Sequence, residues 1–167
     1  LEQGFENLDY YIPDRYGEGY GISTKSIDFA SENNFSLIIA LDCGIKSVEK
    51  IQYASTKGID FIICDHHRPG DTLPPAAAVL DAKRPDSVYP FEELSGCGVG
   101  FKLIQGYCQR NNIPFSTLYK YLDLVAVSIA ADIVPIIGEN RILAYYGLKL
   151  INSHPRPGLE AILNVGN

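Results

Sequence analysis

The sequence contains no methionine and no tryptophan, although it is 167 residues long. A natural reading frame begins with methionine, whereas this chain begins at Leu1, inside what resembles the interior of a folded region. We therefore expect the chain to be a piece of a longer protein. Its length corresponds to one domain of ordinary size, which is enough to bury a hydrophobic core.

Cysteine is also scarce. The four cysteines are too few for a disulfide-stabilised scaffold of this length, and no two of them have the Cys-x-x-Cys spacing of a zinc site. We therefore expect a reducing, cytoplasmic location. Cys43 and Cys64 flank two aspartates, and we interpret them as small buried side chains rather than reactive thiols.

Long apolar runs and an excess of positive charge are missing too. The longest apolar stretches, such as residues 37–41 and 61–64, are far shorter than the roughly 20 residues that cross a bilayer, and no export signal precedes them. We therefore expect no membrane association. Fourteen Lys and Arg stand against 20 Asp and Glu, and the net charge of −6 argues against a domain that binds DNA through a broad basic face.

Short apolar runs alternate with helical segments in the first part of the chain. We expect a helix of about ten residues capped by Ser23 or Thr24, a second helix at 47–57, and strands at 36–41, 60–64 and 76–80. Continuous apolar runs of strand length are typical of a parallel sheet covered on both faces. From residue 96 onward the pattern indicates helices, at 100–111, 116–134, 139–153 and after Pro157. The sequence predicts an α/β fold, with a parallel β-sheet flanked by helices in about 1–95 and a C-terminal helical portion in about 96–167.

Two aspartates follow neighbouring strands of this predicted sheet. Asp42 and Asp65 lie 23 residues apart, which corresponds to one strand-helix-strand unit, and each comes directly after its strand. The carboxyl ends of parallel strands form the ligand crevice of an open sheet, so we expect both carboxylates to converge there. His66 and His67 follow Asp65, and mixed oxygen and imidazole ligands suit Mn²⁺, Fe²⁺ or Zn²⁺. Each aspartate alone could be a turn former, but the cluster favours a metal site.

A further carboxylate belongs to the helix expected at 116–134. Asp132 falls on the same face as an apolar stripe formed by Leu118, Leu122, Val125 and Ile129. A buried carboxylate needs a partner, so Asp132 is either a metal ligand or part of a hydrogen-bonded turn at Pro135. Asp123 falls on the opposite face, where we expect it to be solvated.

Several of these residues occur in an ordered set of motifs that resembles the DHH phosphoesterase superfamily. The Asp65-His66-His67 triplet is its central element. The matching segments are residues 11–15, 18–21, 41–44, 62–71, 95–102, 130–135, 139–143 and 156–158, in that order along essentially the whole chain. Within the superfamily, the chain is most similar to bacterial exonucleases that are specific for single-stranded DNA.

The resemblance implies a fold, a reaction and a set of site residues. It implies hydrolysis of phosphodiester bonds by two divalent cations, Mn²⁺ or Mg²⁺, in 5′ to 3′ degradation of single-stranded DNA during DNA repair and recombination. Asp42, His66 and Asp132 would be metal ligands, and Asp42 is the best candidate to bridge the two cations. Asp65 and His67 would be catalytic residues in or next to the coordination sphere, with His67 contacting phosphate or water.

The chain also lacks parts that the resemblance implies. The first motif of the family, an Asp-x-Asp-x-x-Gly that supplies further carboxylates, has no counterpart here, and the second domain expected after Asn167 is absent. We therefore expect this piece alone to bind metal weakly and to have little or no nuclease activity. The chain also has Asp81-Ala82 where related sequences tend to carry Asn-Pro, and a turn at Asp81 is more plausible than a place in the crevice.

Contacts with nucleic acid are expected at a few local positions. Arg15 and Arg68 are candidates, as is Gly98 in the glycine-rich segment 96–100, whose amides could hold a phosphate at a helix start. The alternative is that the arginines lie on an ordinary surface and that the glycines allow a tight turn. His154, in a loop between helices, is expected to be inert. Single-stranded DNA is the expected partner, together with replication or repair proteins.

Two other functions stay open. The chain could be an oligoribonucleotide or cyclic-dinucleotide phosphodiesterase, or a pyrophosphatase, that uses the same metals. It could also be a non-catalytic replication scaffold, although a scaffold has no need of converging acids.

Overall fold

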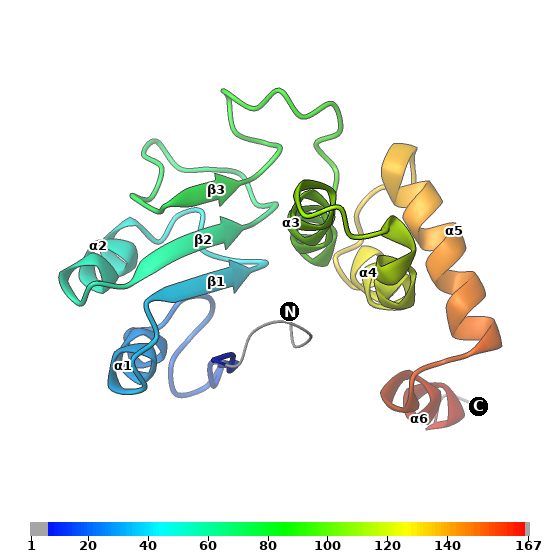
Figure 1. Ribbon diagram of the computed structural model, residues 1–167, viewed down its shortest axis with the longest axis horizontal. Helices are drawn as coiled ribbons and strands as arrows, with labels where there is room; N and C mark the ends of the chain where they lie inside the picture. The colour runs from blue at the N-terminus through cyan, green and yellow to red at the C-terminus, as the bar shows by residue number, and fades with distance from the viewer. Residues whose placement is uncertain (1–6, 166–167) are drawn as a thin grey trace.

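The computed structural model describes residues 7–165 and contains a parallel three-stranded sheet in the order β1-β2-β3 (Figure 1). The strands are β1 (Leu37–Leu41), β2 (Asp60–Cys64) and β3 (Ala78–Leu80). Their last residues pair with one another, Leu41 with Cys64 and Cys64 with Leu80, so all three strands end at one edge. The predicted α/β fold with a parallel sheet is therefore confirmed, and β3 is two residues shorter than expected.

Two helices cover one face of the sheet. They are α1 (Thr24–Glu32) and α2 (Val48–Thr56). Of the two predicted candidates, Ser23 and Thr24, it is Ser23 that caps α1, because its hydroxyl accepts a hydrogen bond from Ser26 N at 2.9 Å. Alternate strand residues pack on these helices, and the buried cluster consists of Ile27, Ala30, Ala40, Ile51, Ala54, Ile59, Phe61 and Ile63.

The other face of the sheet is covered by α3 (Gly96–Arg110), which lies between the sheet and α4 and α5 in Figure 1. This helix begins four residues before the predicted start at residue 100. The reason is a cap at Ser95, whose buried hydroxyl accepts from Gly98 N at 3.2 Å. The earlier start brings Gly96 and Cys97 into the helix and places its first turn beside the carboxyl edge of the sheet.

The remaining helices are η1 (Phe115–Tyr121, a 3₁₀ helix), α4 (Leu122–Ala131), α5 (Gly138–Ser153) and α6 (Pro157–Val165). The single helix expected at 116–134 is therefore two elements. It ends at Ala131 because Ile133 adopts the left-handed conformation, with φ at 53°, two residues before Pro135. Within residues 7–165, no helix is long and apolar enough to cross a membrane.

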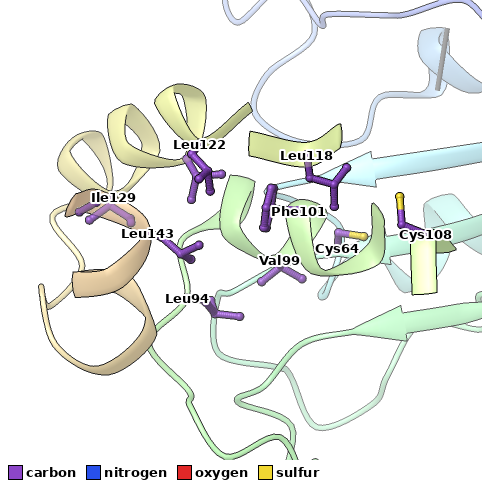
Figure 2. Packing of buried hydrophobic residues seen from close by; sticks show 11 residues of the cluster. Cys64, Leu94, Val99, Phe101, Cys108, Leu118, Leu122, Ile129 and Leu143 are labelled. Carbon is purple, nitrogen blue, oxygen red and sulfur yellow. The ribbon is translucent and has the colours of Figure 1, made fainter. Parts of the chain in front are cut away.

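A single apolar cluster joins the sheet to the helical portion (Figure 2). It includes Cys64 from β2, Phe101 from α3, Leu118 from η1, Ile129 from α4 and Leu143 from α5. The expected stripe of η1 and α4 is buried within it, with Val125 and Ile129 each 1% exposed. Because α3 belongs to both portions, the change in composition near residue 96 does not separate two cores.

The expectation that Asp123 is solvated is wrong. The side chain is only 2% exposed, and it forms a bidentate ion pair with Arg156. The arginine Nε lies 2.6 Å from Oδ2, and its Nη2 lies 2.7 Å from Oδ1. The helix-face argument failed because it considered α4 alone, whereas the connection between α5 and α6 covers the outer face of α4 at this point. Arg156 also donates to Lys120 O at 2.9 Å, which ties that connection to the end of η1.

Candidate metal centre

The predicted carboxylates do lie at the carboxyl edge of the sheet. Asp42 follows β1 and adopts a left-handed conformation, with φ at 62°, that turns the chain immediately after the strand. Its N–H still donates to Cys64 O at 2.8 Å. Asp65 follows β2 in the same way, with its N–H donating to Leu80 O at 3.0 Å. The hydrogen bonds of the sheet therefore extend to the backbone N–H of both aspartates and hold their backbones in place.

The side chain of Asp65 turns into the protein. It is 1% exposed, and one carboxylate oxygen accepts from Ile45 N at 2.9 Å. The other accepts from the N–H groups of His66 and His67 and contacts His67 Nδ1 at 2.7 Å. Burial alone would raise the pKa of Asp65, but these donors together hold it below its usual value. The carboxylate is fully engaged in shaping the turn that carries the two histidines.

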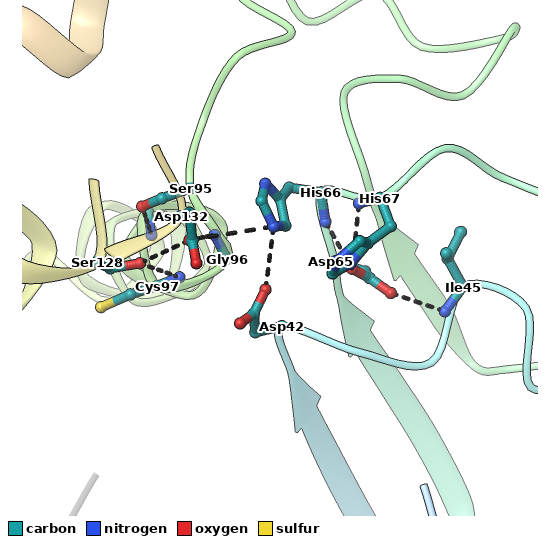
Figure 3. A network of polar contacts seen from close by, with 11 residues as sticks. Asp42, Ile45, Asp65, His66, His67, Ser95, Gly96, Cys97, Ser128 and Asp132 are labelled. Carbon is teal, nitrogen blue, oxygen red and sulfur yellow. Dashed lines mark hydrogen bonds and ion pairs between the residues drawn. The ribbon is translucent and has the colours of Figure 1, made fainter. Parts of the chain in front are cut away.

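His66 lies between the sheet and the helical portion (Figure 3). Its Nε2 lies 3.1 Å from Asp42 Oδ1 and 4.0 Å from Asp132 Oδ2. The contact with Asp42 raises the pKa of His66 above 6.5; burial acts in the opposite direction, and the charge of Asp132 adds to the increase. The imidazole is thus the point where residues from three separate segments meet.

Asp132 reaches the site from the end of α4. Its Oδ2 accepts from Gly96 N at 3.3 Å and from the Ser128 hydroxyl at 3.1 Å. Ser128 in turn accepts from Cys97 N at 3.3 Å, so the end of α4 and the start of α3 are joined directly (Figure 3). The Asp132 side chain is 21% exposed, and its hydrogen bonds go to Gly96 and Ser128 rather than to the turn at Pro135. Its role as a metal ligand stays a prediction.

Gly96 is required by the close approach of Asp42. A Cβ atom added at this glycine would lie 2.1 Å from Asp42 Oδ1, well inside van der Waals contact. The sequence analysis singled out the glycine-rich segment for phosphate binding and missed this role. Ser128 was missed as well, although its place four residues before Asp132 puts both side chains on one helix face.

The donor set fits a divalent transition metal. Asp42, His66 and His67 each offer one ligand atom, and these atoms lie within 4.8 Å of one another. Apart from its contact with His66, the buried Oδ1 of Asp42 has no hydrogen-bond partner in the described part of the chain. Carboxylate and imidazole together are ligands of the kind that Mn²⁺ accepts. Asp132 falls outside this group of three and approaches it through His66.

The two histidines differ in what they can offer. His67 is about half exposed, and its Nδ1 is committed to Asp65, so Nε2 is the nitrogen that remains for a ligand or substrate. His66 is mostly buried, with 11% of its side chain exposed, and its Nε2 faces the carboxylates. His154, by contrast, is exposed at the end of α5.

The three residues expected to contact nucleic acid have different surroundings. Arg15 is exposed, and its guanidinium lies 5.6 Å from the ring centre of Tyr20, which is 67% exposed. Arg68 is exposed and lines a shallow cleft of about 380 Å³ together with Lys83, Glu92 and Glu93. The N–H of Gly98 is buried and donates to Ser95 Oγ, so this glycine has no amide to offer a phosphate and serves helix capping instead.

Asp81 and the cysteines lie close to the site without joining it. Asp81 is 5% exposed and accepts from Lys83 N at 2.8 Å, as expected for a turn, and burial raises its pKa. Burial also raises the pKa of Cys43 to about 11 and of Cys64 to about 12. These thiols are protonated at neutral pH, which agrees with the interpretation that they are small buried side chains.

Relatives of this chain are exonucleases. It is 39% identical over 174 residues to the single-stranded-DNA-specific exonuclease RecJ of Escherichia coli, covering 98% of this chain and 30% of that protein. It is 40% identical over 165 residues to RecJ of Bacillus subtilis, covering 99% of this chain and 20% of that protein. The chain therefore spans less than a third of the length of these curated relatives.

Solved structures of the same kind match the fold. An exonuclease RecJ bound to manganese superimposes with a TM-score of 0.80 at 34% identity, over 93% of this chain and 39% of that one. RecJ of Thermus thermophilus in complex with Mn²⁺ gives a TM-score of 0.71 at 30% identity, over 85% of this chain and 21% of that one. A model of the DHH family, N-terminal domain, matches residues 1–129, and the chain belongs to the DHH family.

Proposed function

We propose that this chain carries the DHH part of a metal-dependent exonuclease that hydrolyses phosphodiester bonds in single-stranded DNA. The observation that carries the proposal is the convergence of Asp42, His66 and His67 at the carboxyl edge of the sheet, with Asp132 4.0 Å from His66. The printed names of the RecJ relatives supply the substrate, and the Mn²⁺ in two solved RecJ structures supports the metal. We further propose 5′ to 3′ polarity, a role in DNA repair and recombination, and a cytoplasmic location.

Asp42, His66 and Asp132 would hold the divalent cations, Mn²⁺ or Mg²⁺. Asp42 is best placed to be shared, because it lies between His66 on one side and the first turn of α3 on the other. Two bound cations would supply Lewis acidity toward the phosphate and lower the pKa of a nearby water. The chain itself fixes the ligands in advance through the turn at Asp65 and through the donors to Asp132.

His67 would act toward the substrate. Asp65 accepts its Nδ1–H, which orients the ring and leaves Nε2 to receive a proton from water or to contact a phosphate oxygen. Asp65 is too deeply buried to touch a substrate itself. We therefore propose a positioning role for Asp65 in place of the catalytic role expected from the sequence.

Binding of DNA would use few charges from this chain. Arg15 beside the exposed ring of Tyr20 offers a cation for phosphate and a surface on which a base could stack. Arg68 follows the histidines directly and could contact the same strand. With a net charge of −6, the chain would repel DNA until the cations bind, so most of the affinity would come from the metal centre and from other parts of the protein.

Histidine replacement tests the proposal at full natural length. His66→Ala should lower Mn²⁺ affinity by at least about 100-fold and abolish Mn²⁺-dependent degradation of a labelled single strand. His67→Ala should reduce degradation with a smaller loss of metal affinity, and His154→Ala is the matched control that changes neither. Calorimetric titration and a gel assay measure the two properties. Unchanged Mn²⁺ affinity in His66→Ala would contradict the assignment.

The substrate is tested separately on the same protein. Single-stranded DNA labelled at either end, duplex DNA, short RNA and a cyclic dinucleotide should be compared at equal concentration. We expect rapid loss of the 5′ label from single-stranded DNA alone. Preference for short RNA or a cyclic dinucleotide would favour the alternative phosphodiesterase, and no cleavage of any substrate with Mn²⁺ bound would favour the scaffold.

A further inference from the structure

A fully buried amide lies at the first turn of α5, outside the metal centre. Asn140 is 0% exposed, and with Leu143, Ala144 and Gly147 it forms the buried face of this helix. An apolar residue would suit such a face equally well for packing. Packing alone therefore does not explain an amide at this position, and its hydrogen bonds are the feature that an apolar residue could not supply.

Both protons of this amide are used across the fold. Nδ2 of Asn140 donates to Glu93 O and, at 3.0 Å, to Pro135 O. Its Oδ1 is buried without a partner among residues 7–165. The hydrogen bonds of the Asn140 side chain are therefore the two that Nδ2 donates. Leaving an amide oxygen unpaired in the interior costs about 1–3 kcal/mol, which the two donated bonds must outweigh.

The two carbonyls belong to the segments that deliver one side of the metal centre. Glu93 lies two residues before Ser95, which caps α3 at the point where Gly96 N–H meets Asp132. Pro135 lies three residues after Asp132, just beyond the turn that ends α4. Asn140 thus joins the entry to α3 and the exit from α4, the two segments that must stay in register for Gly96 to hold Asp132.

The neighbouring Glu139 strengthens the same connection. Its carboxylate accepts from the Tyr89 hydroxyl at 2.9 Å and pairs with Lys102 of α3 at 2.7 Å. The first turn of α5 therefore contacts the segment before α3, α3 itself and the segment after α4. None of these contacts includes a proposed metal ligand.

We propose that Asn140 is a positioning residue of the metal centre, which it supports by fixing the backbone on both sides of the Gly96–Asp132 contact. This inference rests on the proposed function. Without the two donors, the segment 93–96 and the turn 132–135 are joined only through the contacts of Gly96 with Asp132 and of Cys97 with Ser128, and the distance from Asp132 to His66 is less tightly fixed. The effect falls on metal binding rather than on folding alone.

Asn140→Leu tests this in the protein at its full natural length. Leucine has the same branched shape and the same number of side-chain heavy atoms as asparagine, but it removes both donors. We expect Mn²⁺ affinity, measured by calorimetric titration, to fall about 10- to 100-fold, the range found when groups that orient metal ligands are removed. Asn140→Ser, which retains one donor, should fall between Asn140→Leu and the wild type.

The matched control is Asp123→Asn. It also weakens a buried polar contact of the helical portion, the pair with Arg156, but it does not touch the segments at 93–96 or 132–135. We expect a lower melting temperature for the metal-free control with unchanged Mn²⁺ affinity. Asn140→Leu with reduced stability and wild-type Mn²⁺ affinity would overturn the inference, whereas a wild-type protein that binds no Mn²⁺ would overturn the proposed function itself.

A second measurement needs no variant and covers the case in which Asn140→Leu does not fold. Hydrogen exchange of the wild type should be compared with and without Mn²⁺. We expect Mn²⁺ to slow exchange at 93–97, at 132–135 and in the first turn of α5 together. Protection of the Asp132 turn without any change in α5 would show that Asn140 does not couple to the site.

Discussion

At the scale of single residues, Gly96 limits how the two sides of the metal centre approach each other. Its missing side chain leaves the space that Asp42 Oδ1 occupies, because an added Cβ would lie 2.1 Å from that oxygen. We predict that Gly96→Ala displaces Asp42 and lowers Mn²⁺ affinity at least about tenfold. Calorimetric titration of the full-length protein with Mn²⁺ measures the loss.

The matched control lies in the same helix. A Cβ added at Gly106 meets nothing within 4 Å, so Gly106→Ala should leave Mn²⁺ affinity unchanged. It should also stabilise α3 by about 0.5–1 kcal/mol, because alanine has the higher helix propensity. Equal Mn²⁺ affinity in both variants would show that Asp42 does not depend on the space at Gly96.

His66 links metal binding to pH. Its pKa in the folded, metal-free protein is raised above 6.5, mainly by Asp42. The resulting stabilisation is fully present below pH 6.5 and is lost as the pH rises through the folded-state pKa. Mn²⁺ needs the neutral imidazole, so metal affinity should rise across the same range in which metal-free stability falls.

Two titrations of one protein check this opposite behaviour. Melting temperature without metal and Mn²⁺ affinity should be followed from pH 5.5 to 8.5, in the wild type and in His66→Gln. The variant should lose the His66 contribution to both curves. The stability difference between the wild type and His66→Gln should shrink between pH 6.5 and 8. A difference that grows over this range would refute the assignment.

The sequence predicted which residues approach the site better than it predicted their roles. Asp42, His66 and Asp132 lie close together in the structure. Their approach was predictable because they follow strand ends and a helix end, and periodicity locates such positions. Asp65 was expected to converge with Asp42, but its carboxylate turns inward to Ile45 N. The direction of a side chain in a tight turn depends on nearby N–H groups, which no spacing rule reports.

At the scale of elements, the Asp123–Arg156 pair attaches the connection between α5 and α6 to α4. Asp123 is 2% exposed, whereas about a third of the Arg156 side chain is in contact with solvent. Arg156→Ala would leave a buried carboxylate without its cation. We predict a loss of about 2–4 kcal/mol, somewhat below the range for fully buried pairs because the arginine is partly solvated.

Chemical denaturation of Arg156→Ala measures this loss. Arg110→Ala removes an exposed arginine at the end of α3 and serves as the control, with an expected change below about 1 kcal/mol. Equal losses in the two variants would show that the pair contributes no more than a surface charge. Mn²⁺ affinity should be unaffected in both variants, since neither residue contacts the metal centre.

The elements themselves were largely predictable, with errors at their boundaries. β2 has the predicted bounds, and α1 is capped by Ser23, one of the two residues predicted for that role. The start of α3 was misplaced because its glycines argue against helix by intrinsic propensity, whereas the Ser95 cap and the close packing around Gly96 favour it. The segment at 115–131 divides into η1 and α4, a distinction that apolar spacing alone does not make.

At the scale of the whole molecule, the metal centre depends on one shared apolar core. Asp42 and His66 come from the sheet and Asp132 from the helical portion, and Phe101 of α3 packs in the cluster between them (Figure 2). Phe101 is 3% exposed, so Phe101→Ala should cost about 3–5 kcal/mol of unfolding free energy. Because this cluster contains residues of both the sheet and the helices, we predict that the two portions unfold in one transition, in the wild type and in the variant alike.

Two spectroscopic probes test this prediction on the same sample. Far-ultraviolet circular dichroism follows the helices, most of which lie after residue 95. A fluorophore attached at the exposed position 52 by Gln52→Cys follows the sheet side through α2. Both probes should give coincident denaturation curves that shift together in Phe101→Ala. Phe115→Ala, at a ring that is 41% exposed, should shift them much less. If the probe on α2 kept its midpoint while the helical signal was lost earlier, the two portions would be separate folding units, and a metal centre that spans them would need bound cations to hold its two sides together.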